Sequence, residues 1–205
     1  MDYKTVAKEA RAEFVEKRSR FIGHIKPVET QEEALEFIGD LKTKYWDATH
    51  NVYAYNIRQG GVRRFSDDGE PQGTAGMPVL DVLLKEDVTD CVVVVTRYFG
   101  GTLLGAGGLV RAYSHAAKLA LDSGGIARMV LCSRCELECD YGLFERVRQL
   151  IEFWEGVIED SDFSDSVKIK FYLIKEKVDN FEDALSDLSL GKVQNKRIEE
   201  LFAKI

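Results

Sequence analysis

The sequence lacks the features that mark membrane-spanning and secreted proteins. No window of 18 residues is both apolar and uncharged, so no membrane-spanning helix is expected. The opening segment, residues 1–14, is charged throughout and contains no apolar signal-peptide core. We therefore expect a cytoplasmic protein that has no membrane partner.

Cysteine and histidine are too few to indicate a metal site. The four cysteines are Cys91, Cys132, Cys135 and Cys139, and only the middle two have the Cys-x-x-Cys spacing of zinc sites. No second such pair and no histidine pair lies nearby, although a structural zinc site needs four ligands. We expect buried free thiols, no bound metal and no cofactor.

Positive charge is also scarce. The chain of 205 residues has 28 Lys and Arg against 35 Asp and Glu, which gives a net charge of −7. Residues 1–128 are nearly neutral, with 17 basic and 18 acidic residues, whereas residues 129–205 have 11 basic and 17 acidic residues. Because negative charge repels polyanions, any nucleic acid should contact the first of these segments.

Hydrophobic patterning predicts an α+β protein with two domains, residues 1–128 and residues 129–205. A Ser-Gly-Gly turn at residues 123–125 ends a helical pattern and marks the boundary. The second domain reads strand, helix, strand, strand, helix, strand, which is the order of a ferredoxin-like domain. This organisation places most of the net negative charge in the second domain.

Turn and capping residues outline the first domain. Two early strands are expected to meet near residues 16–19, and Thr30 is the expected cap of the helix that follows. The Gly60-Gly61 pair predicts a two-residue hairpin turn between two further strands. Thr74 is the expected cap of a short helix, after which comes a strand that is apolar on both faces.

Five glycines within nine residues separate this apolar strand from a helix that is expected to begin near residue 108. They are Gly100, Gly101, Gly105, Gly107 and Gly108. The segment fits neither the phosphate-loop pattern nor the dinucleotide fingerprint. It does place the free amides of a helix N-terminus beside Arg97, Tyr98 and Arg111, which favours binding of an anion or a nucleic acid. The alternative is that the glycines only permit close packing.

A second candidate cluster contains carboxylates and histidines. Asp67, Asp68 and Glu70 place three carboxylates within four residues, a donor set that magnesium accepts. His50 and His115 are candidate general bases, but no nucleophile elbow accompanies them. The alternative is a polar turn with structural histidines, so no catalytic residue is assigned.

A third candidate surface combines arginine with tyrosine. Arg58, Arg63 and Arg64 bracket the predicted hairpin turn, and Tyr53 and Tyr55 lie on its first strand. Such a sheet face can hold single-stranded RNA. Equally, these charges can protect a solvated edge strand from aggregation.

Three segments resemble the signature blocks of the Impact/YigZ family: "ATHNVYAY", "SDDGEPQGTAGMPVLDVL" and "VVVVTRYFGGTLLGAGGLVRAYSHAA". The close match covers residues 20–125, and the remainder resembles the second domain of the bacterial members. The family signature falls here on His50, Asn51, Ser66, Asp67, Asp68, Gly69, Glu70, Pro71, Gly73, Thr74, Gly76, Thr96, Arg97, Tyr98, Gly100, Gly101, Gly105, Gly107, Gly108, Arg111 and Tyr113.

The resemblance implies a fold and a general function. The first domain would be like the second domain of ribosomal protein S five, with a left-handed βαβ connection, and the second like the last domain of elongation factor G. It implies a translation-associated regulator that binds RNA, the ribosome or a ribosome-associated protein. The alternative is a magnesium-dependent hydrolase or transferase that handles phosphate at the glycine-rich loop. Neither pattern nor resemblance predicts the oligomeric state.

Overall fold

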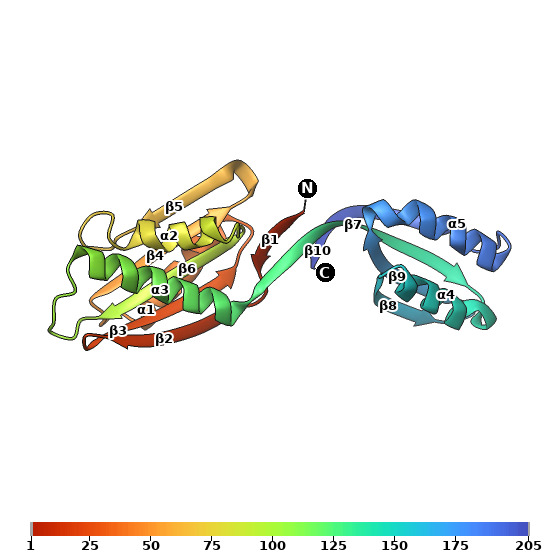
Figure 1. The fold of residues 1–205 in the computed structure, drawn as a ribbon. Coiled ribbons are helices and arrows are strands. Elements are labelled where there is room, and N and C mark those ends of the chain that lie inside the picture. Colours follow the sequence, from red (N-terminus) through yellow and green to blue (C-terminus); the bar gives the residue numbers. More distant parts are fainter. Residues whose placement is uncertain (1, 205) are drawn as a thin grey trace. The chain divides into compact units, whose positions relative to one another are not determined.

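The computed structural model describes residues 2–204, which form two compact units (Figure 1). One unit spans Tyr3–Arg128, and the other is built mainly from the residues that follow. Each unit has a sheet of antiparallel strands and a hydrophobic core of its own. The protein is therefore a two-domain α+β molecule, as its hydrophobic patterning predicts.

The first unit is built on a sheet with the strand order β2-β3-β6-β4-β5, in which all neighbours are antiparallel. Its strands are β2 (Ala10–Glu16), β3 (Ser19–Pro27), β4 (His50–Ile57), β5 (Val62–Ser66) and β6 (Cys91–Tyr98). Strand β6 is central, as its continuous apolar sequence predicts. The short strand β1 (Tyr3–Val6), which precedes them, was not expected from the pattern.

Three helices cover the two faces of this sheet. Helices α2 and α3 lie side by side on one face, and α1 lies on the other (Figure 1). Their bounds are α1 (Gln31–Lys44), α2 (Gly76–Lys85) and α3 (Ala106–Gly124). Thr30 caps α1 as expected, because its hydroxyl oxygen accepts a hydrogen bond from the Glu33 amide at 3.2 Å. Helices α2 and α3 both begin near the end of the sheet at which β6 finishes.

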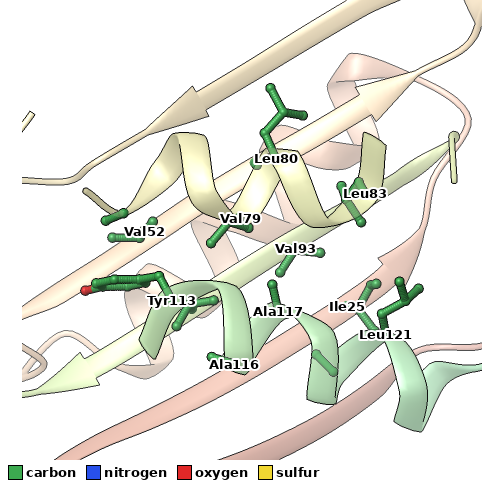
Figure 2. Close-up of a cluster of buried hydrophobic side chains, with 14 of the residues drawn as sticks. Ile25, Val52, Val79, Leu80, Leu83, Val93, Tyr113, Ala116, Ala117 and Leu121 are labelled. Atoms are coloured by element: carbon green, nitrogen blue, oxygen red, sulfur yellow. The ribbon is translucent and has the colours of Figure 1, made fainter. Parts of the chain in front are cut away.

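The core of the first unit lies on both sides of β6, because successive side chains of a strand point to opposite faces. Val93 and Val95 pack under α2 and α3, where Tyr113 fills the space near the start of α3 (Figure 2). Val92 and Val94 pack under α1 on the opposite face. The central strand is thereby removed from solvent on both faces.

The turns of this sheet differ from the prediction at one of two positions. Strands β2 and β3 are joined by a two-residue turn, Lys17-Arg18, whose φ angles of 45° and 69° are left-handed. Strands β4 and β5 are joined by four residues, 58–61, because Ile57 pairs with Val62. The expected two-residue glycine turn is therefore wrong, although both of its glycines do adopt a positive φ.

The second unit has the predicted order of elements. Its bounds are β7 (Ile126–Cys139), α4 (Tyr141–Phe153), β8 (Val157–Phe163), β9 (Val167–Ile174), α5 (Val178–Ser189) and β10 (Asn195–Lys204). Strand β7 pairs with β9 along one edge and with β10 along the other, and β8 pairs with β9. Phe171 of β9 and Phe181 of α5 meet in its core, with ring centroids 5.4 Å apart.

The four cysteines are buried free thiols. Burial is the largest cause of the raised pKa of each thiol. Within residues 2–204, no three His, Cys, Asp or Glu side chains are placed to share a metal ion. In the same residues, no helix combines the length and the apolar character that crossing a membrane requires.

His24 on β3 should make stability fall in mild acid. Burial, followed by the charges of Arg11 and Lys44, lowers the pKa of His24 to about 4 from an ordinary value of 6.5. The unfolded chain therefore takes up the proton first, so stability is full above pH 6.5 and falls as the pH drops toward 4, by about 2–3 kcal/mol. Urea unfolding of the wild type and of His24→Gln at several pH values between 4 and 6.5 isolates the effect. The same dependence of the free energy of unfolding on pH in both proteins would contradict it.

Candidate functional site

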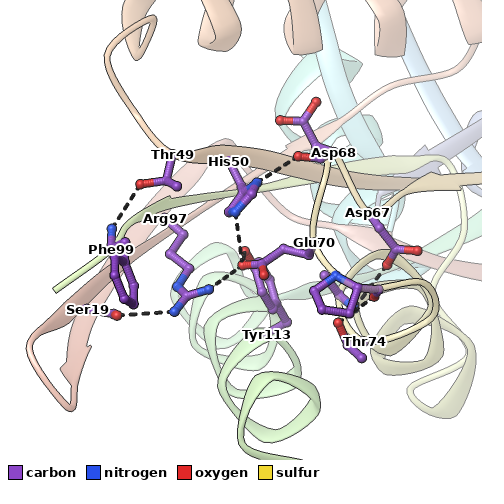
Figure 3. Close-up of polar contacts among 12 residues, drawn as sticks. Ser19, Thr49, His50, Asp67, Asp68, Glu70, Thr74, Arg97, Phe99 and Tyr113 are labelled. Carbon is purple, nitrogen blue, oxygen red and sulfur yellow. Dashed lines mark hydrogen bonds and ion pairs between the residues drawn. The ribbon is translucent and has the colours of Figure 1, made fainter. Parts of the chain in front are cut away.

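Several signature residues meet at one end of the first sheet. Because β4 and β6 are antiparallel, His50 at the start of β4 pairs with Arg97 at the end of β6. The loop between β5 and α2 passes over the same end and brings Glu70 beside both residues (Figure 3). Tyr113 of α3 reaches Glu70 as well. Residues that are far apart in the sequence thus form one polar network.

Glu70 is the centre of this network. Its Oε1 accepts hydrogen bonds from Arg97 Nη1 at 2.5 Å and from the Tyr113 hydroxyl at 2.7 Å. The side chains of Glu70 and Arg97 are only 4% and 5% exposed. Burial, together with the bond to Glu70, raises the pKa of the Tyr113 hydroxyl. The carboxylate is therefore a buried counter-ion, and losing either charge would leave the other without compensation.

The backbone fixes the orientation of His50. Its Nδ1 lies 2.8 Å from the carbonyl oxygen of Asp68, and a carbonyl can only accept, so Nδ1 carries the proton. In the neutral ring, Nε2 then presents its lone pair toward the Glu70 carboxylate, 3.7 Å away. His50 therefore ties the loop to β4, and only its protonated form pairs with Glu70.

Asp67 caps α2 in place of Thr74. Its Oδ1 accepts hydrogen bonds from the amides of Ala75 and Gly76, at 3.0 and 2.8 Å. A carboxylate at this position also interacts favourably with the helix dipole. The hydroxyl of Thr74, the expected cap, instead donates to the carbonyl of Pro71 at 2.6 Å. The prediction of Thr74 as the cap is wrong, because the loop folds back and brings a more distant carboxylate to the helix.

Asp68 ties the same loop to two other elements. Its Oδ2 accepts a hydrogen bond from the amide of Asn51 at 2.7 Å, and its Oδ1 forms an ion pair with Lys42 Nζ at 2.8 Å. Asp67, Asp68 and Glu70 are therefore all bound by other groups of the protein. These contacts do not fit the expectation that the three carboxylates together hold magnesium.

Arg97 and Tyr98 are also committed to contacts within the protein. The second terminal nitrogen of Arg97 donates to Ser19 Oγ at 3.3 Å, and its buried Nε has no hydrogen-bond partner among the described residues. The Tyr98 hydroxyl donates to Asp47 at 2.8 Å. Arg97 lies inside the protein, a position that does not fit the expectation that it contacts a bound anion.

Packing explains part of the glycine-rich segment. The Gly100 amide donates to Ser19 Oγ at 3.2 Å, and a Cβ at Gly100 would lie 2.1 Å from the carbonyl carbon and oxygen of Arg18. Gly101 and Gly105 have φ angles of 82° and 70°, which favour glycine. Close approach and chain reversal therefore account for these three glycines. Gly107 and Gly108 instead lie inside α3, which begins at Ala106, slightly earlier than expected.

The first turns of α3 line a pocket of about 250 Å³ between β2 and α3. Its lining residues are Phe14, Glu16, Lys17, Leu104, Gly108, Arg111, Ala112 and His115. Among the described residues, no side chain caps the exposed N-terminus of α3. Arg111 therefore lies in a pocket near the start of α3, where its cationic neighbour is Lys17 and not the expected Arg97.

The pocket also contains residues that the sequence interpretation missed or placed elsewhere. His115 packs against Phe14, with ring centroids 4.7 Å apart, and does not join the network around Glu70. Phe14, Glu16 and Lys17 were not recognised as site residues. Alternation along β2 was the available signal, because Phe14 and Glu16 are two apart and share one face of the strand.

Most of the arginines and tyrosines of the predicted hairpin surface are engaged within the protein, and Tyr53 stacks on Tyr55 and lies under Lys42. Arg58 pairs with Asp90 at 3.3 Å, and Arg63 donates to Asn56 at 3.4 Å. Tyr55 is buried in the cluster under α1. These contacts favour the interpretation of β5 as a charged edge strand over that of an RNA-stacking face.

Two family models match the chain in separate segments. The Impact N-terminal domain matches residues 17–121, and a domain of unknown function, DUF1949, matches residues 137–192. The chain belongs to the Impact family. IMPACT family member YvyE of Bacillus subtilis is 37% identical over 93% of this chain and 88% of its own length. IMPACT family member YigZ of Escherichia coli is 36% identical over 90% of this chain and 92% of its own length.

A solved structure and eukaryotic proteins extend this comparison within the Impact family. A crystal structure described as that of a hypothetical protein is 33% identical, with a TM-score of 0.61, and the match covers 97% of this chain and 98% of that one. Protein IMPACT of Xenopus laevis is 36% identical over 44% of this chain and 30% of its own length. Membership of the Impact family fits a regulatory role in general.

Proposed function

We propose that this Impact-family protein is a regulator that binds RNA, including RNA of the ribosome, at the pocket between β2 and α3. The observation that supports RNA is that Lys17, Arg111 and His115 line one pocket beside the exposed start of α3. Guanidinium groups and helix N-terminal amides both bind phosphate. The nearly neutral first unit also avoids the repulsion that the acidic second segment would impose on RNA.

Two further expectations fit this proposal. The likeness of the first unit to the second domain of ribosomal protein S five, and of the second unit to the last domain of elongation factor G, stays a prediction. Both proteins work at the ribosome, so the analogy supports a ribosomal site or a ribosome-associated protein as the partner. The hydrogen bonds of Asp67, Asp68 and Glu70 favour binding over magnesium-dependent catalysis, because each carboxylate already serves the fold.

Removing either cation of the pocket should weaken RNA binding. We expect Arg111→Ala and Lys17→Ala each to weaken binding severalfold and to lower the slope of log affinity against log salt by about 1, because each removes one phosphate contact. Fluorescence anisotropy of a labelled single-stranded RNA, measured at several salt concentrations, gives both quantities. Sedimentation with ribosomes tests the same variants on the larger partner.

Arg64→Ala is the matched control, because Arg64 is an exposed arginine on β5, where the hairpin surface lies. It removes the same charge without altering the pocket, so RNA binding should stay near that of the wild type. Equal weakening by Arg64→Ala and Arg111→Ala would show that net charge alone matters. Weakening by Arg64→Ala alone would move the RNA site to the hairpin and overturn the proposal.

A further inference from the structure

The pocket between β2 and α3 holds two cations that the protein leaves unpaired. Within residues 2–204, neither Lys17 nor Arg111 has a hydrogen-bond or ion-pair partner, and both side chains are exposed. Arg20 of the same unit is paired, with Glu13 at 2.8 Å. Arg18 and Lys85 also have no hydrogen-bond or ion-pair partner among the described residues, but neither lines the pocket. Two unpaired cations at one pocket match a group that carries more than one negative charge.

Helix α3 places all of its pocket residues on one face. Gly108, Arg111, Ala112 and His115 are spaced at three, four and seven residues, so they share one face of α3. His115 adds a ring nitrogen that can donate a hydrogen bond to phosphate. This face of α3 is therefore suited to an anionic oxygen group.

The side of the pocket formed by β2 has a different chemistry. Phe14 supplies an aromatic wall, which is held by stacking on Phe21 at 5.2 Å between ring centroids. Glu16 supplies a carboxylate, which repels phosphate but accepts hydrogen bonds from hydroxyl groups. An internal phosphodiester of RNA carries one negative charge, and it needs neither an aromatic wall nor a carboxylate in order to bind a basic surface.

We infer that the pocket binds a ribonucleotide that carries a terminal phosphate, with the phosphate at Lys17 and Arg111, the ribose 2′-hydroxyl at Glu16 and the base against Phe14. The inference rests on the proposed function and names the ligand of the same site. A terminal phosphate carries up to two negative charges, so it matches two cations better than an internal phosphate does. A free mononucleotide and the 5′-phosphorylated end of an RNA share this chemistry.

The test compares ligands that differ in one group. A ten-residue RNA with a 5′-phosphate should bind the full-length protein about tenfold more tightly than the same RNA with a 5′-hydroxyl. Arg111→Ala should remove most of this difference. Adenosine monophosphate distinguishes the two sources. If it displaces the phosphorylated RNA at a concentration near that RNA's dissociation constant, the natural ligand is a free nucleotide. If it does not displace the RNA and the tenfold preference remains, the ligand is an RNA end.

Two controls test the sugar and the phosphate separately. Glu16→Gln, at an exposed position, should reduce the preference for 5′-phosphorylated RNA over DNA of the same sequence, and Arg64→Ala should not. Inorganic phosphate that competes as well as adenosine monophosphate would overturn the inference, because base and ribose would then contribute nothing. Equal binding of the two RNAs would also overturn it, while leaving the proposed function intact. Binding of adenosine monophosphate without either RNA would support the pocket and contradict the proposed function.

Discussion

Glu70→Ala should destabilise the first unit by about 3–5 kcal/mol, because it removes the counter-charge of a buried guanidinium. Arg97 is 4% exposed and would keep its charge without the carboxylate that accepts its hydrogen bond. The Tyr113 hydroxyl would lose its acceptor at the same time. Urea unfolding combined with hydrogen exchange measures the loss in the full-length chain, and the second unit serves as an internal reference.

Two conservative variants separate charge from packing at Glu70. Glu70→Gln keeps the size and one acceptor oxygen but loses the charge, so we expect a smaller loss of about 1–3 kcal/mol. Tyr113→Phe removes one hydrogen bond and should cost about 1 kcal/mol. A gain of stability in Glu70→Ala would contradict the structural role. Such a gain would identify Glu70 as a residue kept at the expense of stability for a ligand or a reaction.

Gly100→Ala should also cost about 3 kcal/mol or more. The added Cβ would lie 2.1 Å from the carbonyl carbon and oxygen of Arg18, which are backbone atoms of the turn between β2 and β3. Overpacking ordinarily costs about 1–3 kcal/mol, and more where the backbone itself must shift. Urea unfolding measures the loss of stability. In the extreme case the first unit does not fold, and its amides then exchange hydrogen without protection.

Gly107→Ala is the matched control, and it should raise the free energy of unfolding instead of lowering it. No atom would lie within 4 Å of a Cβ at this position, which is in the first turn of α3. Alanine is a better helix residue than glycine, so a gain of about 0.5–1 kcal/mol is expected. Equal destabilisation by the two substitutions would show that the segment needs flexible backbone as such. Close packing at one position would then not be the cause.

Helices and strands with strong hydrophobic periodicity could be predicted from the sequence, because the pattern of apolar residues within each element determines which of its faces is buried. The valines of β6 show why: a strand that is apolar on both faces must be central. The cap of α2 could not be predicted, because Asp67 reaches the Gly76 amide from nine residues earlier only after the loop has folded back. The prediction of a two-residue turn at Gly60-Gly61 was wrong. The loop begins at Arg58 because of the strand register, and that register depends on partners elsewhere in the sheet.

The candidate site was predictable in its residue types but not in its pairings. Arg97 and Glu70 are 27 residues apart, and no local pattern shows that one neutralises the other. Arg111 was recognised from its helix, whereas Lys17 joins it only because β2 packs beside α3. The resemblance to the Impact family marked most of these positions without saying which were structural. Burial then separated the structural Arg97 from the exposed Arg111.

The turn between β2 and β3 has a consequence for how this protein can change. Lys17 and Arg18 adopt φ angles of 45° and 69°, a conformation that costs a non-glycine residue about 1–2 kcal/mol. An Asn-Gly pair would adopt it readily. That exchange would make the hairpin more robust and would remove a positive charge from the rim of the pocket. If the pocket binds the anion proposed above, fold stability and ligand binding place opposite demands on position 17, because Lys17 lines the pocket.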